Sequence, residues 1–184
     1  MLASFECVLS VANRSKDIAV AGGPPTGFFR IKSAEREKLG CEKQWLGLLR
    51  KAEPQEQLKM KKKQDSAAIL CLTAVPGGSN RVTIQLMPRD PMLYVSVQHD
   101  QPVVELYQAQ DGSGRQIWNV HQAKLPSGRI GCKLSVRGGH HDAQGRHSLS
   151  CGLAASDEDV NLSQDHCWFM EEVLQNSKSG CVVQ

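Results

Sequence analysis

The second half of the chain contains the same pattern twice: a series of short segments in which apolar and polar residues alternate. Residues 81–120 and residues 129–173 each hold four segments in which apolar and polar residues alternate, and a tryptophan, Trp118 or Trp168, lies in the last of them. Alternation with a period of two is typical of β-strands that bury one face. A unit of this kind cannot bury its apolar face alone and must pack against copies of itself. The sequence therefore predicts a mostly β chain with two clear four-strand repeats.

The two blocks match residue by residue within the segments, and their spacing drifts only between segments. Val82 matches Ile130 near the start of each block, and Trp118 matches Trp168 near the end. Insertions are tolerated in turns, whereas a slip of one residue within a strand would turn its apolar side chains outward. Two unrelated runs of strand-like sequence are the alternative interpretation. The side chains that we expect in the structural core are Trp118, Trp168, Leu106 and Leu162.

The part of the chain before the repeats has a different character. Residues 33–64 are rich in Glu, Lys, Gln and Leu, which favour helix, although Pro54 should interrupt any continuous helix. We therefore expect an N-terminal region that is partly helical, irregular or mobile, or else a degenerate first repeat. The expected divisions are an N-terminal region over residues 1–65, β repeats over residues 66–174 and a flexible tail over residues 175–184.

Composition and cysteine usage exclude several classes of protein. A net charge of +3 is too small to indicate nucleic-acid binding, which usually needs a clustered basic face. No run of about 18 apolar residues is present, so no transmembrane helix is expected. The seven cysteines are odd in number and form no CxxC pair, which argues against a disulfide framework and a zinc ribbon. These features are typical of a reduced, cytoplasmic protein.

The four-strand unit, with a Gln-x-Trp after a Gly/Ser turn, resembles the β-trefoil lectins of the ricin type. It also resembles β-trefoil protease inhibitors and actin-crosslinking trefoils. The resemblance is carried by residues 104–107 and 112–118 of the first block, and by residues 148–151, 160–162 and Trp168 of the second. It implies a β-trefoil-like fold in which three such units surround an axis. The N-terminal region would have to supply the third unit, and its absence would leave an open edge that predicts oligomerisation.

Several polar and aromatic residues gather at the turns of the repeats, where a ligand can reach them. Aromatic rings with nearby carboxylate and amide groups can hold a sugar by stacking and hydrogen bonding. Ordinary strand-surface residues are the alternative interpretation. The candidate ligand-binding residues are Tyr94, His99, Asp100, Tyr107, Asp111, His140 and His141. Adjacent histidines rarely face one ion, so we expect His140 and His141 at a polar rim and not in a metal site.

The chain ends in Cys181, followed by two valines and a glutamine, which has the form of a C-a-a-X box. Glutamine in the last position favours a farnesyl group on the cysteine thiol. A chance match is the alternative. The motif therefore predicts lipidation at Cys181 and a peripheral membrane location, although a single lipid gives only marginal membrane binding.

No motif in the chain points to catalysis. There is no GxSxG nucleophile elbow, and the glycines near residue 77 lack the lysine of a phosphate-binding loop. We therefore expect a non-catalytic binding module without cofactor or metal, in which carbohydrate is the first ligand to consider. A protein-interaction or protease-inhibitor module with no sugar ligand is the alternative. The expected partners are a glycan or protein ligand and a membrane reached through the farnesyl group, with no nucleic acid.

Overall fold

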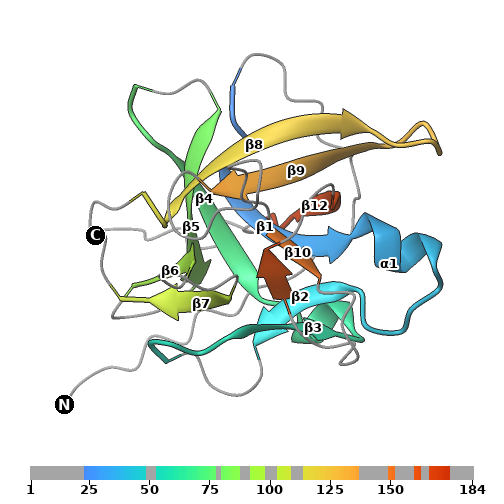
Figure 1. Cartoon of the computed structure of the whole chain (residues 1–184), viewed down its shortest axis with the longest axis horizontal. Coiled ribbons are helices and arrows are strands. Elements are labelled where there is room, and N and C mark those ends of the chain that lie inside the picture. The colour runs from blue at the N-terminus through green and yellow to red at the C-terminus, as the bar shows by residue number, and fades with distance from the viewer. Residues whose placement is uncertain are drawn as a thin grey trace, which may run out of the picture.

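Figure 1 shows a computed structural model of the chain, in which β-strands dominate. It describes residues 23–48, 53–77, 80–87, 92–97, 103–108, 114–136, 149–151, 160–162 and 166–174. The strands of the first third are β1 (Gly27–Ser33), β2 (Trp45–Leu48), β3 (Leu58–Lys61) and β4 (Ile69–Ala74). They are followed by β5 (Arg81–Met87), β6 (Leu93–Val97), β7 (Val104–Tyr107), β8 (Ile117–Lys124), β9 (Ile130–Val136), β10 (Leu149–Cys151), β11 (Val160–Leu162) and β12 (Trp168–Glu172). The helices are α1 (Ala34–Lys38) and the 3₁₀ turn η1 (Gln64–Ser66).

Six strands close into an antiparallel barrel. Strand β1 pairs with β12 on one side and with β4 on the other, and the ring continues through β5, β8 and β9 back to β12. The remaining strands form the hairpins β2–β3, β6–β7 and β10–β11. Each run of four strands thus supplies two barrel strands and one hairpin. The prediction of a mostly β chain is confirmed, and strands lie at all eight segments expected in the second half.

The finer fold expectation needs correction. The sequence resemblance implied a β-trefoil of the ricin-lectin or inhibitor type, whereas the structure is a closed all-β antiparallel barrel. Alternation within a segment predicts a strand, but it carries no information about which strands pair with one another. Closure depends on β1 meeting β12 across almost the whole chain, and only the tertiary structure settles that contact. A closed barrel has no exposed sheet edge within its ring, and here one chain supplies all six strands.

The lysine- and glutamate-rich stretch that favoured helix contains a strand hairpin and only a short helix among its described residues. Among the described residues between 33 and 63, only α1 is helical, and β2 and β3 form a hairpin in which Leu46 pairs with Met60. Leu46, Leu58 and Met60 are almost completely buried. Helix propensity differs by only a few tenths of a kcal/mol between common residues, whereas burying one large apolar side chain contributes about 1.5–3 kcal/mol. Burial of these side chains therefore outweighs the local preference.

The core inside the barrel includes three of the four side chains expected there. Trp118, Trp168 and Leu106 are fully buried among the large apolar residues of one continuous cluster. The indole nitrogen of Trp118 donates a hydrogen bond to the carbonyl oxygen of Val95 at 2.9 Å. This bond ties β8 to the β6–β7 hairpin. Leu162 pairs with Leu149 through the backbone, and its side chain lies outside the described part of the structure.

Candidate functional site

Two of the predicted ligand residues lie side by side on the β6–β7 hairpin. Tyr94 of β6 and Tyr107 of β7 are direct partners in the strand register. Direct partners of an antiparallel pair point to the same face of the sheet, with Cβ atoms about 4.5–5.5 Å apart. The residues that flank them, Leu93, Val95 and Leu106, point into the core and are fully buried. Both tyrosines are half-buried on the opposite, outward face.

Polar groups surround this tyrosine pair. Gln85 of β5 is the register partner of Tyr94 on its other side, and Ser96 pairs with Glu105 one step further along the hairpin. The guanidinium carbon of Arg115 lies 5.7 Å from the centre of the Tyr107 ring, within the range of a cation–π contact. We call this group the tyrosine-pair site. Its members are Gln85, Tyr94, Ser96, Glu105, Tyr107 and Arg115.

The Glu105 carboxyl group of the tyrosine-pair site has little contact with water. The side chain of Glu105 is buried, and this burial raises the pKa of its carboxyl group, while attraction to Arg115 acts in the opposite direction. The backbone of Arg115 is held close by, since its carbonyl oxygen accepts a hydrogen bond from the amide of Val97. The site therefore places a carboxyl group and a guanidinium beside two phenol rings, where hydrogen bonds to charged groups are strong.

The other predicted ligand residues cannot be placed in this way. His99, Asp100, Asp111, His140 and His141 lie outside the described residues, as does Cys181. Conversely, sequence reasoning missed Gln85, Glu105 and Arg115. A signal for Glu105 was present, because Val104, Glu105, Leu106 and Tyr107 alternate, so Glu105 must share a face with Tyr107.

A second polar cluster lies where β1 meets α1 and the start of β12. Nε2 of His166 is 2.9 Å from the hydroxyl oxygen of Ser33 and 3.1 Å from Oε2 of Glu35. The imidazole of His166 and Oε2 of Glu35 are close, but their geometry is not that of a hydrogen bond. The other carboxylate oxygen, Oε1, accepts a hydrogen bond from the amide of Cys167 at 2.8 Å. We call this group the His166 clasp.

The His166 clasp has the residue types of a catalytic triad but not its geometry. In a triad the nucleophile and the carboxylate bind different nitrogens of the imidazole. Here Ser33 and Glu35 approach the same nitrogen, and Ser33 is fully buried. The Ser33 hydroxyl also accepts a hydrogen bond from the amide of Arg36, as an N-cap of α1 does. This arrangement fits a structural joint between the first and last strands of the barrel.

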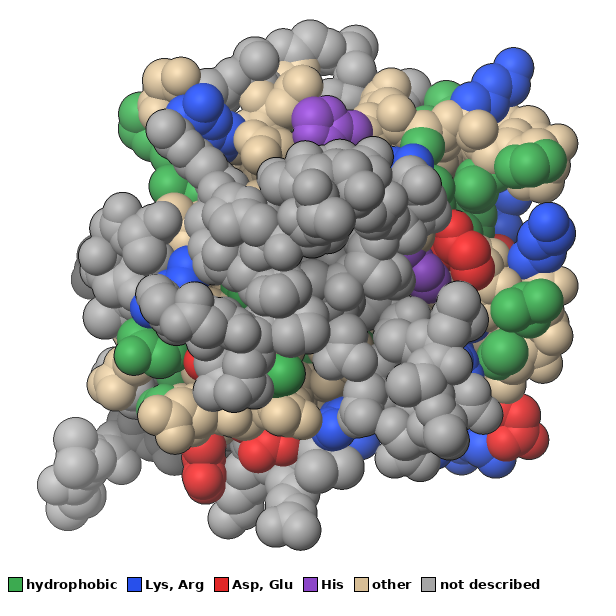
Figure 2. All heavy atoms as spheres, in the orientation of Figure 1, with side chains coloured by type: hydrophobic (Ala, Val, Ile, Leu, Met, Phe, Trp, Pro, Cys, Tyr) green, Lys and Arg blue, Asp and Glu red, His purple; other side chains and the backbone are tan. Residues whose placement is uncertain are grey.

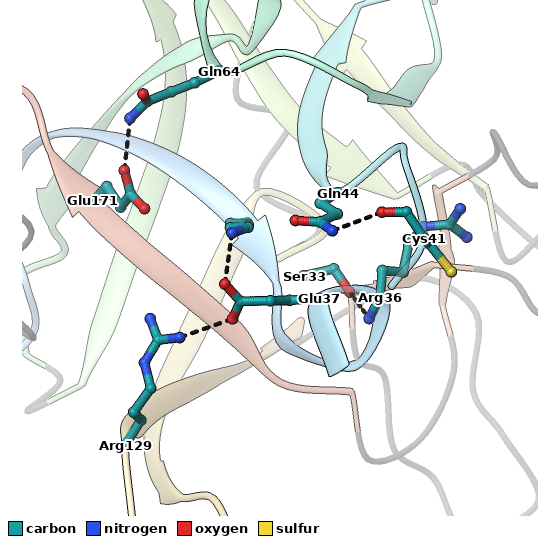
Figure 3. Close-up of polar contacts among 9 residues, drawn as sticks. Ser33, Arg36, Glu37, Cys41, Gln44, Gln64, Arg129 and Glu171 are labelled. Atoms are coloured by element: carbon teal, nitrogen blue, oxygen red, sulfur yellow. Dashed lines mark hydrogen bonds and ion pairs between the residues drawn. The ribbon is translucent and has the colours of Figure 1, made fainter. Parts of the chain in front are cut away.

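A third polar cluster covers the outer face of β1 and β12, as Figure 3 shows. Glu37 of α1 accepts hydrogen bonds from Nζ of Lys32 at 2.6 Å and from Arg129 at 2.8 Å. The guanidinium of Arg129 stacks 3.7 Å above the ring of the buried Phe169. Burial alone would raise the pKa of Glu37, but its bonds and attraction to Lys32 and Arg129 outweigh burial and lower this pKa.

Replacing the Glu37 carboxylate is therefore expected to lower the stability of the folded chain moderately. Glu37→Gln should lower the free energy of unfolding by about 1 kcal/mol, since the charges are partly screened by solvent. Because the pKa of Glu37 is lowered on folding, this contribution is present at neutral pH and is lost as the group is protonated in acid. Urea titration at low and high salt measures the effect. An equal loss of stability at 1 M salt would contradict an electrostatic origin.

Figure 2 shows described lysine, arginine, aspartate and glutamate side chains interspersed around this side of the molecule. Within the described ranges, no three His, Cys, Asp or Glu side chains are grouped so that they could hold a metal ion. Among the helices of the described residues, none has the length and apolar character needed to cross a membrane.

Comparison with known proteins identifies the fold but no family. No family model matches the sequence, and no curated protein matches it. A salivary protein from Culex quiquefasciatus, of the cysteine and tryptophan-rich (CWRC) family, superposes with a TM-score of 0.54 at 14% identity, over 84% of this chain and 99% of that one. The lysenin pore structure superposes with a TM-score of 0.52 at 15% identity, over 88% of this chain and 55% of that one.

These matches correct the family resemblance drawn from the sequence. The chain shares its antiparallel β-barrel fold with the CWRC salivary protein and with lysenin, and this finding replaces the assignment to β-trefoil lectins and inhibitors. The C-a-a-X part of that assignment gains no support, since residues 181–184 are not described. At such low sequence identity the likeness concerns the fold, and a fold does not carry a function with it.

Proposed function

We propose that the protein is a non-catalytic binding module that holds a carbohydrate at the tyrosine-pair site. The observation that carries this proposal is the register of β6 and β7, which sets Tyr94 and Tyr107 next to each other on the outward face. The proposal rests on the chemistry of these side chains and does not depend on the lectin resemblance.

The residues of the site match the two kinds of surface that a sugar presents. The C–H face of a pyranose ring packs against aromatic rings, and its hydroxyl groups need donors and acceptors at the edge of those rings. Arg115 supplies donors at the Tyr107 ring, and Gln85 supplies both donors and acceptors beside Tyr94. Hydrogen-bonding groups of this kind also select one sugar over another, because a mismatched hydroxyl leaves a polar group unpaired.

Loss of one tyrosine ring is expected to abolish most sugar binding. Tyr107→Ala should weaken affinity at least about tenfold, since stacking and the packed area of the ring are both lost. Tyr107→Phe keeps the ring and should lose less. A glycan array followed by calorimetric titration measures both, with Leu39→Ala as a control at a residue that is 69% exposed and lies beyond α1. If no sugar binds at millimolar concentration, or if Tyr107→Ala binds as wild type does, the site is not a carbohydrate site.

The second candidate function is protein interaction without a sugar ligand. Apolar side chains near the tyrosine-pair site favour it: Met92, just before β6, is 55% exposed, and the register partners Ile69 and Met87 are both half-buried on the outward face. Tyrosine, methionine and arginine are enriched at protein interfaces. A silent glycan array would favour this candidate, and Met92→Asp should then weaken partner binding while leaving the melting temperature unchanged.

The lipid anchor at Cys181 remains a proposal of its own, together with the cytoplasmic, peripheral membrane location that it implies. Mass spectrometry of the C-terminal peptide from eukaryotic cells is expected to show a farnesyl adduct in wild type and none in Cys181→Ser. Membrane partitioning should fall in the variant, since the lipid supplies the apolar area that binds the bilayer. An unmodified wild-type peptide would end the proposal and leave the binding site unaffected.

A further inference from the structure

The tyrosine pair is one end of a longer row of outward side chains. Strand registers join Tyr107 to Tyr94, Tyr94 to Gln85, Gln85 to Cys71, and Cys71 to Phe28. Each step joins direct partners of neighbouring antiparallel strands, so all five side chains lie on the same face. The row therefore crosses five strands in the order β7, β6, β5, β4 and β1.

The burial of side chains along these strands agrees with the placement of the row on the outward face. Phe28, Cys71, Gln85, Tyr94 and Tyr107 are all half-buried, whereas the residues next to them in the core, such as Phe29, Leu70 and Leu86, are almost completely buried. Neighbouring strands lie about 4.8 Å apart, so four steps span roughly 19 Å. This is much longer than one sugar ring. The row ends on an aromatic ring at each side, with the amide of Gln85 in its middle.

The flanks of the row differ in character. On one side lie the partners Ile69 and Met87, and on the other lie the partners Thr73 and Thr83. Thr73 is exposed, and its hydroxyl oxygen lies 3.8 Å from the sulfur of Cys71, whereas Thr83 is buried. A pyranose chain has apolar C–H faces and hydroxyl-bearing edges, so a surface with apolar side chains along one flank and the exposed Thr73 hydroxyl on the other complements both.

We propose that the carbohydrate site continues from the tyrosine pair across β5 and β4 to Phe28, and that its ligand is a linear oligosaccharide of several units. This inference rests on the proposed function and adds the size class of the ligand. Tyr94 and Tyr107 hold one end of the oligosaccharide, Gln85 binds hydroxyls at the centre, and Phe28 stacks on a unit near the other end.

The dependence of affinity on sugar length tests this inference. The probes are chito-oligosaccharides and malto-oligosaccharides of one to five units, together with the same series of any sugar that the array selects. For the series that binds, wild type should gain at least about tenfold in affinity between one and four units. Phe28→Leu removes the ring but keeps an apolar side chain, and it should reduce this gain without changing the affinity for the single unit.

The outcomes separate the inference from the function on which it rests. Equal affinity for one and four units, or a normal gain in Phe28→Leu, would overturn the extended site and leave the tyrosine-pair site standing. Loss of binding in Tyr107→Ala for every length supports the proposed function. Binding by no member of any series overturns both proposals.

Alkylation of the Cys71 thiol tests the extended site independently of the affinity measurements. Cys71 is half-buried and outside any disulfide, and it lies between Gln85 and Phe28 in the row. A bound four-unit sugar should slow its alkylation at least about threefold, whereas a single unit held at the tyrosines should not. Cys41, half-buried in the segment between α1 and β2, is the internal control within the same protein. Equal alkylation of Cys71 with and without a bound four-unit sugar contradicts the extended site.

Discussion

Trp118→Ala is expected to lower the free energy of unfolding by about 3–5 kcal/mol, enough to unfold a domain of marginal stability. Trp118 is fully buried in the barrel core, so its removal leaves a cavity that the surrounding strands can fill only in part. The substitution also leaves the carbonyl oxygen of Val95 without its hydrogen bond from the indole. Chemical denaturation followed by circular dichroism measures the loss.

Two further variants show whether burial is the cause. Trp168→Ala removes an equally buried indole from β12 and is expected to cost a similar amount. Leu39→Ala removes a side chain that is 69% exposed, and it should change stability by less than about 0.5 kcal/mol. A melting curve for Trp118→Ala that overlays that of wild type would show that the indole contributes nothing to the core.

Acidification is expected to destabilise the protein through the His166 clasp. Burial lowers the pKa of His166 from 6.5 to about 4, and the charge of Arg36 acts in the same direction. As the pH falls below 6.5, the unfolded chain binds a proton that the folded chain does not, so stability falls with pH in this window. A shift of this size corresponds to about 3 kcal/mol between pH 7 and pH 4.

The variant His166→Gln isolates this contribution. Burial raises the pKa of Glu35, so the folded carboxyl is protonated before the unfolded one as the pH falls, and this effect opposes that of His166. Comparing the pH profiles of wild type and His166→Gln removes the terms of titratable groups outside the His166 clasp, and wild type should lose stability relative to the variant steadily from pH 6.5 to pH 4. His121→Gln, at an exposed histidine of β8, is the matched control. Parallel profiles for wild type and His166→Gln would show that His166 has no part in the acid response.

Part of the candidate site could be predicted from the local sequence pattern, and the rest depends on how the strands pair. Tyr94 and Tyr107 could be selected from the sequence because phenol rings near turns are common at binding surfaces. Their adjacency and their contact with Gln85 follow from the register of β5, β6 and β7, and Arg115 joins the site through its contact with the Tyr107 ring. A register depends on contacts between segments that are distant in sequence, and side-chain alternation alone leaves several registers open.

Alternation with a period of two marks which side chains must leave water, so the strands of the second half and the burial of Trp118 and Trp168 could be predicted from the amino-acid pattern. That pattern left open the closure of the barrel by β1 against β12 and the β2–β3 hairpin in the lysine-rich stretch before β4, and the folded chain settles both. The physical reason is the same in both cases. Local preferences amount to tenths of a kcal/mol per residue, and the apolar area buried between distant segments outweighs them.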